Sequence, residues 1–328
     1  MRADMTLMLG TVLPWSSVNV GLLLAAGAAD QVAPWHLVLF LVLLLFLGVP
    51  HGAVDHHVLA RLTHRRLLTL AGAGLIGAYI LIMLGVLVSW WVAPGLTWGV
   101  FLLATVAHWG DGELWYLRQG GLPAGWGWSA AALLLRGGIP LLVPLLAFPG
   151  AFEAVSVAVV GFFGGDASAP FAALPAWVGP LWIVLGASLL AYGAARFRAG
   201  PWSDALKDVG ELLALVLFFA LVPSVLSIGL YLCLWHAPRH VLRLLVFDHG
   251  PHPDLGAVRR LAWNTVPMTA GAALSFAAAL WLVQSGAVEP MTLFAGALAW
   301  VAALTAPHMV VVAWMAARDR RAPNVQTA

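Results

Sequence analysis

The sequence predicts an all-α integral membrane protein, a polytopic bundle of about ten transmembrane helices, with about eight as the lower bound. Three observations predict it. Only 9% of the 328 residues are charged and 62% are hydrophobic, whereas about 25% of the residues in a soluble domain are charged. The mean hydropathy is +0.93. The apolar residues form runs of roughly 20 residues, the length at which a helix crosses a bilayer.

The same composition excludes a soluble enzyme, a disordered chain and a nucleic-acid binder. The formal charge of +2 is too small to indicate an anionic partner. The single Cys233 cannot form an internal disulfide. We therefore expect the lipid bilayer to be the main surroundings of the chain.

Each apolar run is interpreted as one helix. The stretch 209–247 is too long for one span, and Pro223-Ser224 near its middle indicates a turn, so we divide it in two. The region 1–318 is expected to be a single helical domain, the tail 319–328 to be disordered, and no cleaved signal peptide is expected. The runs cover 5–28, 33–57, 67–92, 96–118, 126–149, 171–195, 209–224, 226–247, 261–285 and 290–316.

The basic residues predict how the helices are oriented. They lie at 58–66 and 195–208, at Arg259-Arg260 before the ninth run, and at Arg318 after the tenth. Basic residues favour the cytoplasmic side, and ten spans with both termini cytoplasmic put all these clusters there. We therefore expect a multi-pass protein of the cell (inner) membrane with cytoplasmic N- and C-termini. The connections without Lys or Arg are 28–33, 92–96, 150–170 and 285–290.

Histidines are unusually frequent for so apolar a chain, with 11 against 14 acidic residues. Ionisable groups inside membrane helices are costly and mark function by default. The second, fourth, eighth and tenth runs should be parallel to one another, and each carries histidine about 10 to 18 residues from its start, within a slab of roughly 12 Å. Histidines at one depth can share a metal ion. The candidates are His51, His108, His236, His240 and His308.

Local spacing narrows the choice of ligands. His236 and His240 are four residues apart and face the same side of a helix, where both can bind one ion. Pro238 lies between them and should kink that helix. Asp55, four residues after His51, is placed to orient a ligating imidazole or to serve a neighbour, and Asp111 repeats this relation three residues after His108.

Other polar residues receive weaker interpretations. His308 belongs either to the ligand set or to the layer that supports it. His56 and His57 point away from His51 on a helical wheel, so we expect them at the membrane interface or beside the site. Arg239 is expected to pair with Asp55 or Asp111, or to reach the bilayer surface. A hydrogen-bonded polar cluster without metal is the alternative for the candidate ligands.

The ligand type limits the chemistry without fixing the metal. Imidazole suits zinc, iron, copper and nickel. The lack of cysteine ligands argues against structural zinc, whereas zinc with three histidines and a water molecule would indicate hydrolysis. Iron held by imidazoles keeps open positions, at which dioxygen could bind beside an apolar substrate. Burial in lipid favours a lipid-soluble substrate.

Four motifs resemble the bacteriorhodopsin-related protein (Brp/Blh) family, the membrane β-carotene 15,15′-dioxygenases of bacteria and archaea. The resemblance extends from the second run to the tenth, with the motifs in the same order, while the first run and 150–170 carry no matching motif. The motifs are Pro50-His51-Gly52-Ala53-Val54-Asp55-His56, Ala107-His108-Trp109-Gly110, Trp235-His236-Ala237-Pro238-Arg239-His240 and Pro307-His308-Met309.

The resemblance implies a non-haem Fe(II) held by four histidines, which match His51, His108, His236 and His240 here. It also implies that β-carotene and O2 are the substrates, that the central 15,15′ double bond is cleaved to two all-trans-retinal, and that a retinal-binding rhodopsin is a functional partner. It does not assign a role to Glu113. Asp55 and Asp111 are expected to orient imidazoles.

Three alternatives stay open at this point. A histidine-box di-iron desaturase or hydroxylase acting on a lipid or carotenoid would use about eight histidines, but the chain has only one H-x-x-x-H motif. A metal or proton transporter would show repeated halves with interrupted helices, which are not apparent. A carotenoid- or retinal-binding chaperone would keep the fold without turnover.

Overall fold

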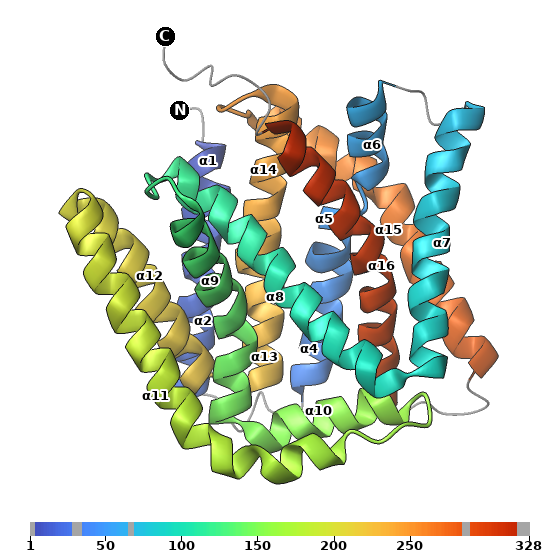
Figure 1. The fold of residues 1–328 in the computed structure, drawn as a ribbon. Coiled ribbons are helices and arrows are strands. Elements are labelled where there is room, and N and C mark those ends of the chain that lie inside the picture. Colours follow the sequence, from blue (N-terminus) through green and yellow to red (C-terminus); the bar gives the residue numbers. More distant parts are fainter. Residues whose placement is uncertain (1–3, 28–34, 65–68, 284–288, 320–328) are drawn as a thin grey trace.

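The computed structural model of the protein describes residues 4–27, 35–64, 69–283 and 289–319. In these ranges the chain forms helices joined by short connections, and no strand occurs (Figure 1). This confirms the predicted all-α membrane bundle. Of the predicted disordered tail, Asp319 instead ends the last helix, and the remainder lies outside the described residues.

The helices follow one another in chain order, and η denotes a π-helical segment. They are α1 (Met5–Leu7), η1 (Met8–Val12), α2 (Leu13–Gly27), α4 (His36–Leu43), η3 (Leu44–Gly48), α5 (Val49–Gly52), α6 (Asp55–Thr63), α7 (Leu70–Val92), α8 (Pro94–Gln119), α9 (Trp126–Ala147), α10 (Pro149–Gly161), α11 (Ser168–Ala199), α12 (Trp202–Leu221), α13 (Ser224–Leu230), η4 (Tyr231–His236), α14 (Ala237–His249), α15 (Leu255–Val283) and α16 (Pro290–Asp319).

Six helical segments of the described chain are long and apolar enough to cross a membrane. The other predicted spans also form helices, namely α8, α12, α13 to α14, and α15, so ten crossings remain a prediction. The six segments are Met5–Gly27, His36–Thr63, Leu70–Val92, Trp126–Ala147, Ser168–Ala199 and Pro290–Arg318.

The ambiguous stretch 209–247 is divided as predicted. Helix α12 ends at Leu221 and α13 begins at Ser224, with extended backbone at Pro223 between them (φ −48°, ψ 137°). The region 150–170, which we treated as a connection, differs from expectation because much of it forms α10. Val159 and Val160 of this short helix are fully buried against apolar residues of its neighbours, which explains why it folds.

The four histidine-bearing helical segments run in the same direction. In Figure 1, α4 to α6, α8, α13 to α14, and α16 all rise from the lower to the upper end of the bundle. The end of α6, the α11–α12 junction, the start of α15 and the end of α16 lie together at the upper end. The basic residues of these segments therefore gather at one end, as the one-sided arginine pattern predicted.

Prolines explain the π-helical segments. A proline has no N–H to donate and its ring clashes with the carbonyl of the preceding turn, and one wide π turn relieves both. Each π segment ends two residues before a proline, and the next amide bonds to the carbonyl five residues back. The kink expected at Pro238 is thus a π turn. The three bonds and prolines are Leu13 to Met8 before Pro14, Val49 to Leu44 before Pro50, and Ala237 to Leu232 before Pro238.

Helices α8 and α9 approach closely through glycine. A methyl group at Gly110 would strike the carbonyl oxygen of Leu133, and one at Gly137 would strike the carbonyl oxygen of Val106. Small residues of this kind allow close helix packing in lipid. The contact holds the part of α8 that carries His108 against α9.

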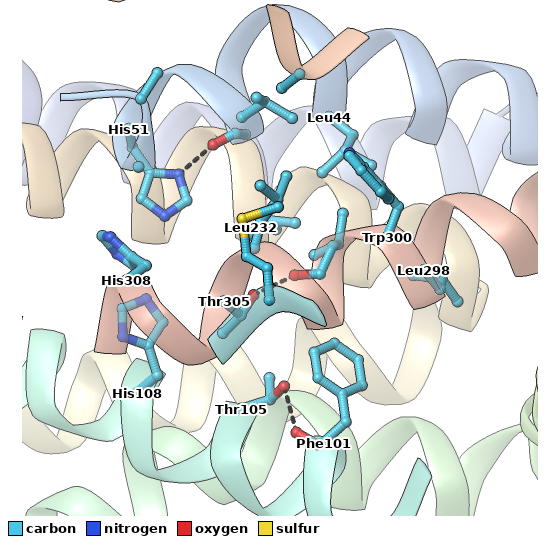
Figure 2. A pocket seen from close by; sticks show the side chains of 18 of the residues that line it. Leu44, His51, Phe101, Thr105, His108, Leu232, Leu298, Trp300, Thr305 and His308 are labelled. Atoms are coloured by element: carbon cyan, nitrogen blue, oxygen red, sulfur yellow. Dashed lines mark hydrogen bonds between the residues drawn. The ribbon is translucent and has the colours of Figure 1, made fainter. Parts of the chain in front are cut away.

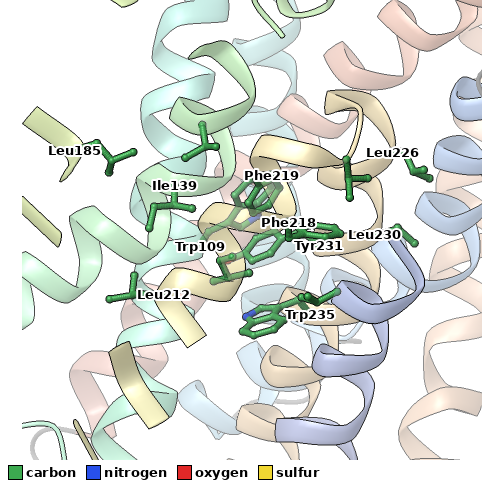
Figure 3. Packing of buried hydrophobic residues seen from close by; sticks show 14 of the residues in the cluster. Trp109, Ile139, Leu185, Leu212, Phe218, Phe219, Leu226, Leu230, Tyr231 and Trp235 are labelled. Carbon is green, nitrogen blue, oxygen red and sulfur yellow. The ribbon is translucent and has the colours of Figure 1, made fainter. Parts of the chain in front are cut away.

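The largest apolar cluster of the described residues joins α8, α9, α12 and α13 to η4 (Figure 3). Phe218, Phe219 and Tyr231 are fully buried in it. Trp109 packs edge-on to Tyr231, with ring centroids 5.1 Å apart. This cluster fixes α8 and η4, the two segments that carry His108 and His236.

Candidate metal centre

Five imidazoles converge in the interior of the bundle, from α5, α8, η4, α14 and α16. Figure 2 shows three of them, His51, His108 and His308, turned toward one another. Centroids of the neighbouring rings are 4.8 Å apart for His108 and His236 and 6.4 Å apart for His51 and His108, with the other recorded pairs between these values. The four predicted ligands, His51, His108, His236 and His240, are thus brought together, and His308 joins them.

The ring nitrogens are spaced for a shared ion. One nitrogen from each of His51, His108 and His236 lies within 4.8 Å of the other two. Nε2 of His236 is 3.2 Å from Nε2 of His108, so these two nitrogens face each other. Three imidazole nitrogens around one point form a ligand set that suits a transition metal.

Unpartnered nitrogens test whether a metal fits. Both nitrogens of His240 and Nε2 of His308 are buried and have no hydrogen-bond partner among the residues the structure describes. Buried polar atoms are rarely left unpaired, and those that are call for an explanation such as an ion. A cation bound among these donors would take Nε2 of His308 and one of the two nitrogens of His240, so the residues present fit a metal.

Hydrogen bonds select the tautomers of two rings. Nδ1 of His308 lies 2.9 Å and 3.0 Å from the two carboxylate oxygens of Asp55, and Nδ1 of His51 faces the carbonyl oxygen of Gly48. Both partners can only accept, so Nδ1 carries the proton and Nε2 presents its lone pair. Such an acceptor behind the ring is typical of metal-bound histidine.

Asp55 is itself held by Tyr79, whose hydroxyl donates to it over 3.0 Å. Sequence spacing placed Asp55 near His51 or a neighbour, and the structure pairs it with His308 from the far end of the chain. Asp111 is placed differently from expectation, because its carboxylate accepts from Arg243 at 2.7 Å and no imidazole bond to it is recorded in the described ranges.

His56 and His57 lie apart from the five rings. Their own rings are 4.0 Å apart, and Nδ1 of His56 is 3.0 Å from the carbonyl oxygen of Ala53. His56 still lines the cavity described below, whereas His57 does not. This agrees with their expected place beside the site.

The prediction for Arg239 was wrong. Its side chain is 1% exposed, so it does not reach the bilayer surface, and it pairs with Glu113 at 2.6 Å and Glu211 at 2.9 Å, not with Asp55 or Asp111. Trp235 also donates to Glu113 over 3.0 Å. These bonds tie the turn between His236 and His240 to the turn after His108.

The network extends into the apolar cluster, and sequence reasoning missed most of it. Arg136 joins Glu211 at 2.9 Å and Asp208 at 2.6 Å, and Arg196 joins Asp208 at 2.8 Å. With Glu113 and Arg239 this makes three arginines and three acids, a neutral set. The signal in the sequence was Arg136 and Glu211 inside apolar runs, but nothing in their spacing indicates that they meet.

A long apolar cavity of about 620 Å³ opens beside the rings. His51, His108 and His308 form part of its wall, and Figure 2 shows Leu44, Phe101 and Leu298 continuing the wall away from them. Most of the other lining residues are apolar. A cavity of this size and character suits a large hydrophobic molecule.

Comparison with known proteins adds the chemistry of the family. A profile of the family described as beta-carotene 15,15′-dioxygenase matches residues 42–316. The chain belongs to this family. It is therefore an oxidoreductase, a carotenoid 15,15′-dioxygenase by family, which decides against a desaturase, a hydroxylase and a transporter.

The similarity to two members of the family covers most of the chain. It is 35% identical over 289 residues to the probable beta-carotene 15,15′-dioxygenase Blh of Halobacterium salinarum, covering 82% of this chain and 81% of that protein. It is 27% identical over 308 residues to the probable dioxygenase Brp of the same species, covering 84% and 82%. No solved structure matches the chain significantly.

Proposed function

We propose that the protein cleaves β-carotene at its central 15,15′ double bond with O2, giving two molecules of all-trans-retinal, at a single non-haem Fe(II). His51, His108, His236 and His240 would hold the iron, and His308 offers a fifth nitrogen. The observation that carries the proposal is the convergence of five buried imidazoles beside a long apolar cavity in a chain of this family.

The iron, the imidazoles and the cavity wall would have separate roles in the reaction. When bound, iron would supply the activation of O2 at its open positions. The imidazoles are neutral donors whose Nδ1 protons, at His51 and His308, are held by acceptors. The cavity wall excludes water and holds the polyene.

The reaction balances without proton transfer. The C=C bond breaks and each of its carbons takes one atom of O2, so one β-carotene and one O2 give two retinals. The acids near the rings agree with this. Asp55 is committed to His308 and Tyr79, and Glu113 to Arg239 and Trp235, so neither needs to act as an acid or base.

The surroundings form part of the proposal. The protein would lie in the cell membrane, with both termini and the basic end of the bundle on the cytoplasmic side. Retinal is released into the same lipid, where a retinal-binding rhodopsin can take it up. Asp55 acts as a positioning residue through His308, while Asp111, held by Arg243, anchors α8 to α14.

Expression in a bacterial host that accumulates β-carotene tests this function. The wild type should bleach the cells and yield retinal by chromatography, and His236→Ala should abolish both. His252→Ala, at an exposed histidine in the α14–α15 connection, is the matched control and should behave as the wild type. Unchanged colour with wild-type protein present in the membrane would contradict the proposal.

A further inference from the structure

One face of α16 leads from the rings into the cavity. Phe294, Leu298, Val301, Thr305 and His308 all line it, and their spacing of three and four residues places them in one stripe along the helix. The stripe begins with an aromatic ring and ends with a histidine. This part of the cavity thus runs along α16 from Phe294 to His308.

The three parallel neighbours repeat this arrangement. In each, residues that line the cavity lead toward a histidine, and over all four segments the separation along the helix is ten to fourteen residues, or roughly 15 to 21 Å. This depth is close to the extended length of one half of β-carotene. The limits are Phe40 to His51, Trp98 to His108, Ser224 to His236 and Phe294 to His308.

We call the part of the cavity between the histidines and the Phe40–Phe294 pair the blind arm. Its far end is closed by that pair. Phe40 and Phe294 are each 3% exposed, and their rings pack edge to face with centroids 5.0 Å apart. Phe40 is backed by Gly229, where an added methyl group would lie 2.7 Å from its ring. The pair therefore forms a supported floor.

The cavity also reaches the surface of the bundle. It continues past Asp55 and Tyr79 to residues of α7 and α15. There Ile76, Ile80 and Met268 are 38%, 47% and 50% exposed. In a membrane this exposed apolar surface faces lipid, so a carotenoid can enter here and one of its ends can reach the floor.

We propose that the Phe40–Phe294 pair sets the position of cleavage. One ring of the carotenoid enters the blind arm first and stops at this floor, which places the fifteenth carbon, and with it the central bond, beside the histidines. The inference rests on the proposed function, and it identifies the two residues that determine which of many similar double bonds is cut.

A deeper floor should move the cut. In Phe294→Ala or Phe40→Ala the ring can advance, so a neighbouring double bond faces the rings. That bond breaks with one O2 as before, but the products are one carbonyl fragment two carbons longer than retinal and one two carbons shorter. We expect the ratio of unequal fragments to retinal to rise at least about tenfold, since small changes in an apolar pocket discriminate by about this factor.

The experiment separates products by chromatography with mass detection, using purified protein and β-carotene. Phe46→Ala is the matched control, because Phe46 lies six residues after Phe40 and is 69% exposed outside the cavity; it should give retinal alone. If an alanine variant does not accumulate, Phe294→Leu and Phe40→Leu test the same floor with a smaller change. Wild-type product ratios in the variants would overturn the floor assignment.

A shortened substrate tests the floor without mutation. A β-apocarotenal that lacks one ring should still give retinal from its ring-bearing half, because the floor measures from the ring. Cleavage at the midpoint of the shortened chain would overturn the proposal. Failure of the wild type to form retinal from β-carotene would instead reject the proposed function, so the two failures are distinguishable.

Discussion

Asp55 shows at the scale of one residue how a buried carboxylate can serve a metal site without touching the metal. It accepts from His308 and from Tyr79, so it fixes both the orientation of the imidazole and its tautomer. A negative charge behind the ring also makes Nε2 a better donor. Asp55 thereby connects α6, α7 and α16 at the depth of the rings.

Asp55→Asn should weaken metal binding. The amide can still accept from Nδ1 of His308 but carries no charge, and loss of such a partner lowers metal affinity by about 10- to 100-fold. Competition with a chromophoric chelator measures the apparent affinity for Fe(II). Tyr79→Phe, which removes only the hydroxyl bonded to Asp55, should have the smaller effect. An unchanged affinity in Asp55→Asn would show that His308 does not contribute to the ion.

Glu113→Gln should destabilise the fold. The change removes the negative charge that Arg239 meets at 2.6 Å and leaves the buried network with one excess positive charge, and breaking a buried ion pair costs about 3–5 kcal/mol. Thermal unfolding in detergent measures the loss. Arg61→Gln is the control, because Arg61 pairs with Asp248 while 54% exposed, and such pairs contribute about 0–1 kcal/mol. Equal losses in the two variants would mean that the buried network is not a stabilising element.

The pairing of α8 with α9 makes a prediction at the scale of the element. Gly137→Ala should lower stability by about 1–3 kcal/mol, because the new methyl group overpacks the contact where the carbonyl of Val106 already lies. Gly138→Ala is the adjacent control, with nothing within 4 Å of the added carbon, and should be neutral or slightly stabilising. Unfolding in mild detergent compares the two, and similar effects would contradict the close approach.

Most of the helices, and the break between two of them, were predictable from the sequence for identifiable reasons. The apolar runs and Pro223 mark the helices and their break, and the arginines give the relative direction of the four histidine helices. The π turns were not predictable, because sequence shows the proline but not how its clash is relieved. The partners of Arg239 were not predictable either, since Glu113 and Glu211 come from other helices and only packing brings them together.

The candidate site was likewise predictable from the sequence only in part. Depth and spacing selected His51, His108, His236 and His240 from their own helices. The pairing of Asp55 with His308 spans 253 positions, so no local pattern indicates it. Helix α10 was missed because it is shorter than a span and folds only against its neighbours.

The whole molecule has a basic end and an end without such clusters, which gives a test of orientation. Ser203→Cys, at the α11–α12 junction, should not react with an impermeant thiol reagent applied to intact cells, whereas Glu289→Cys, just before α16, should react. Both positions are exposed, and the native Cys233 is buried and gives little background. After lysis both should react. Labelling of Ser203→Cys alone in intact cells would reverse the topology.

Metal analysis of the purified protein tests the central claim most directly, because the account requires one iron ion shared by four histidines from three parallel segments of the chain. Elemental analysis of the wild type, set against protein concentration, should give about one iron per chain, and His236→Ala should remove it while His252→Ala retains it. Two irons per chain, zinc in place of iron, or iron retained by His236→Ala would contradict the account.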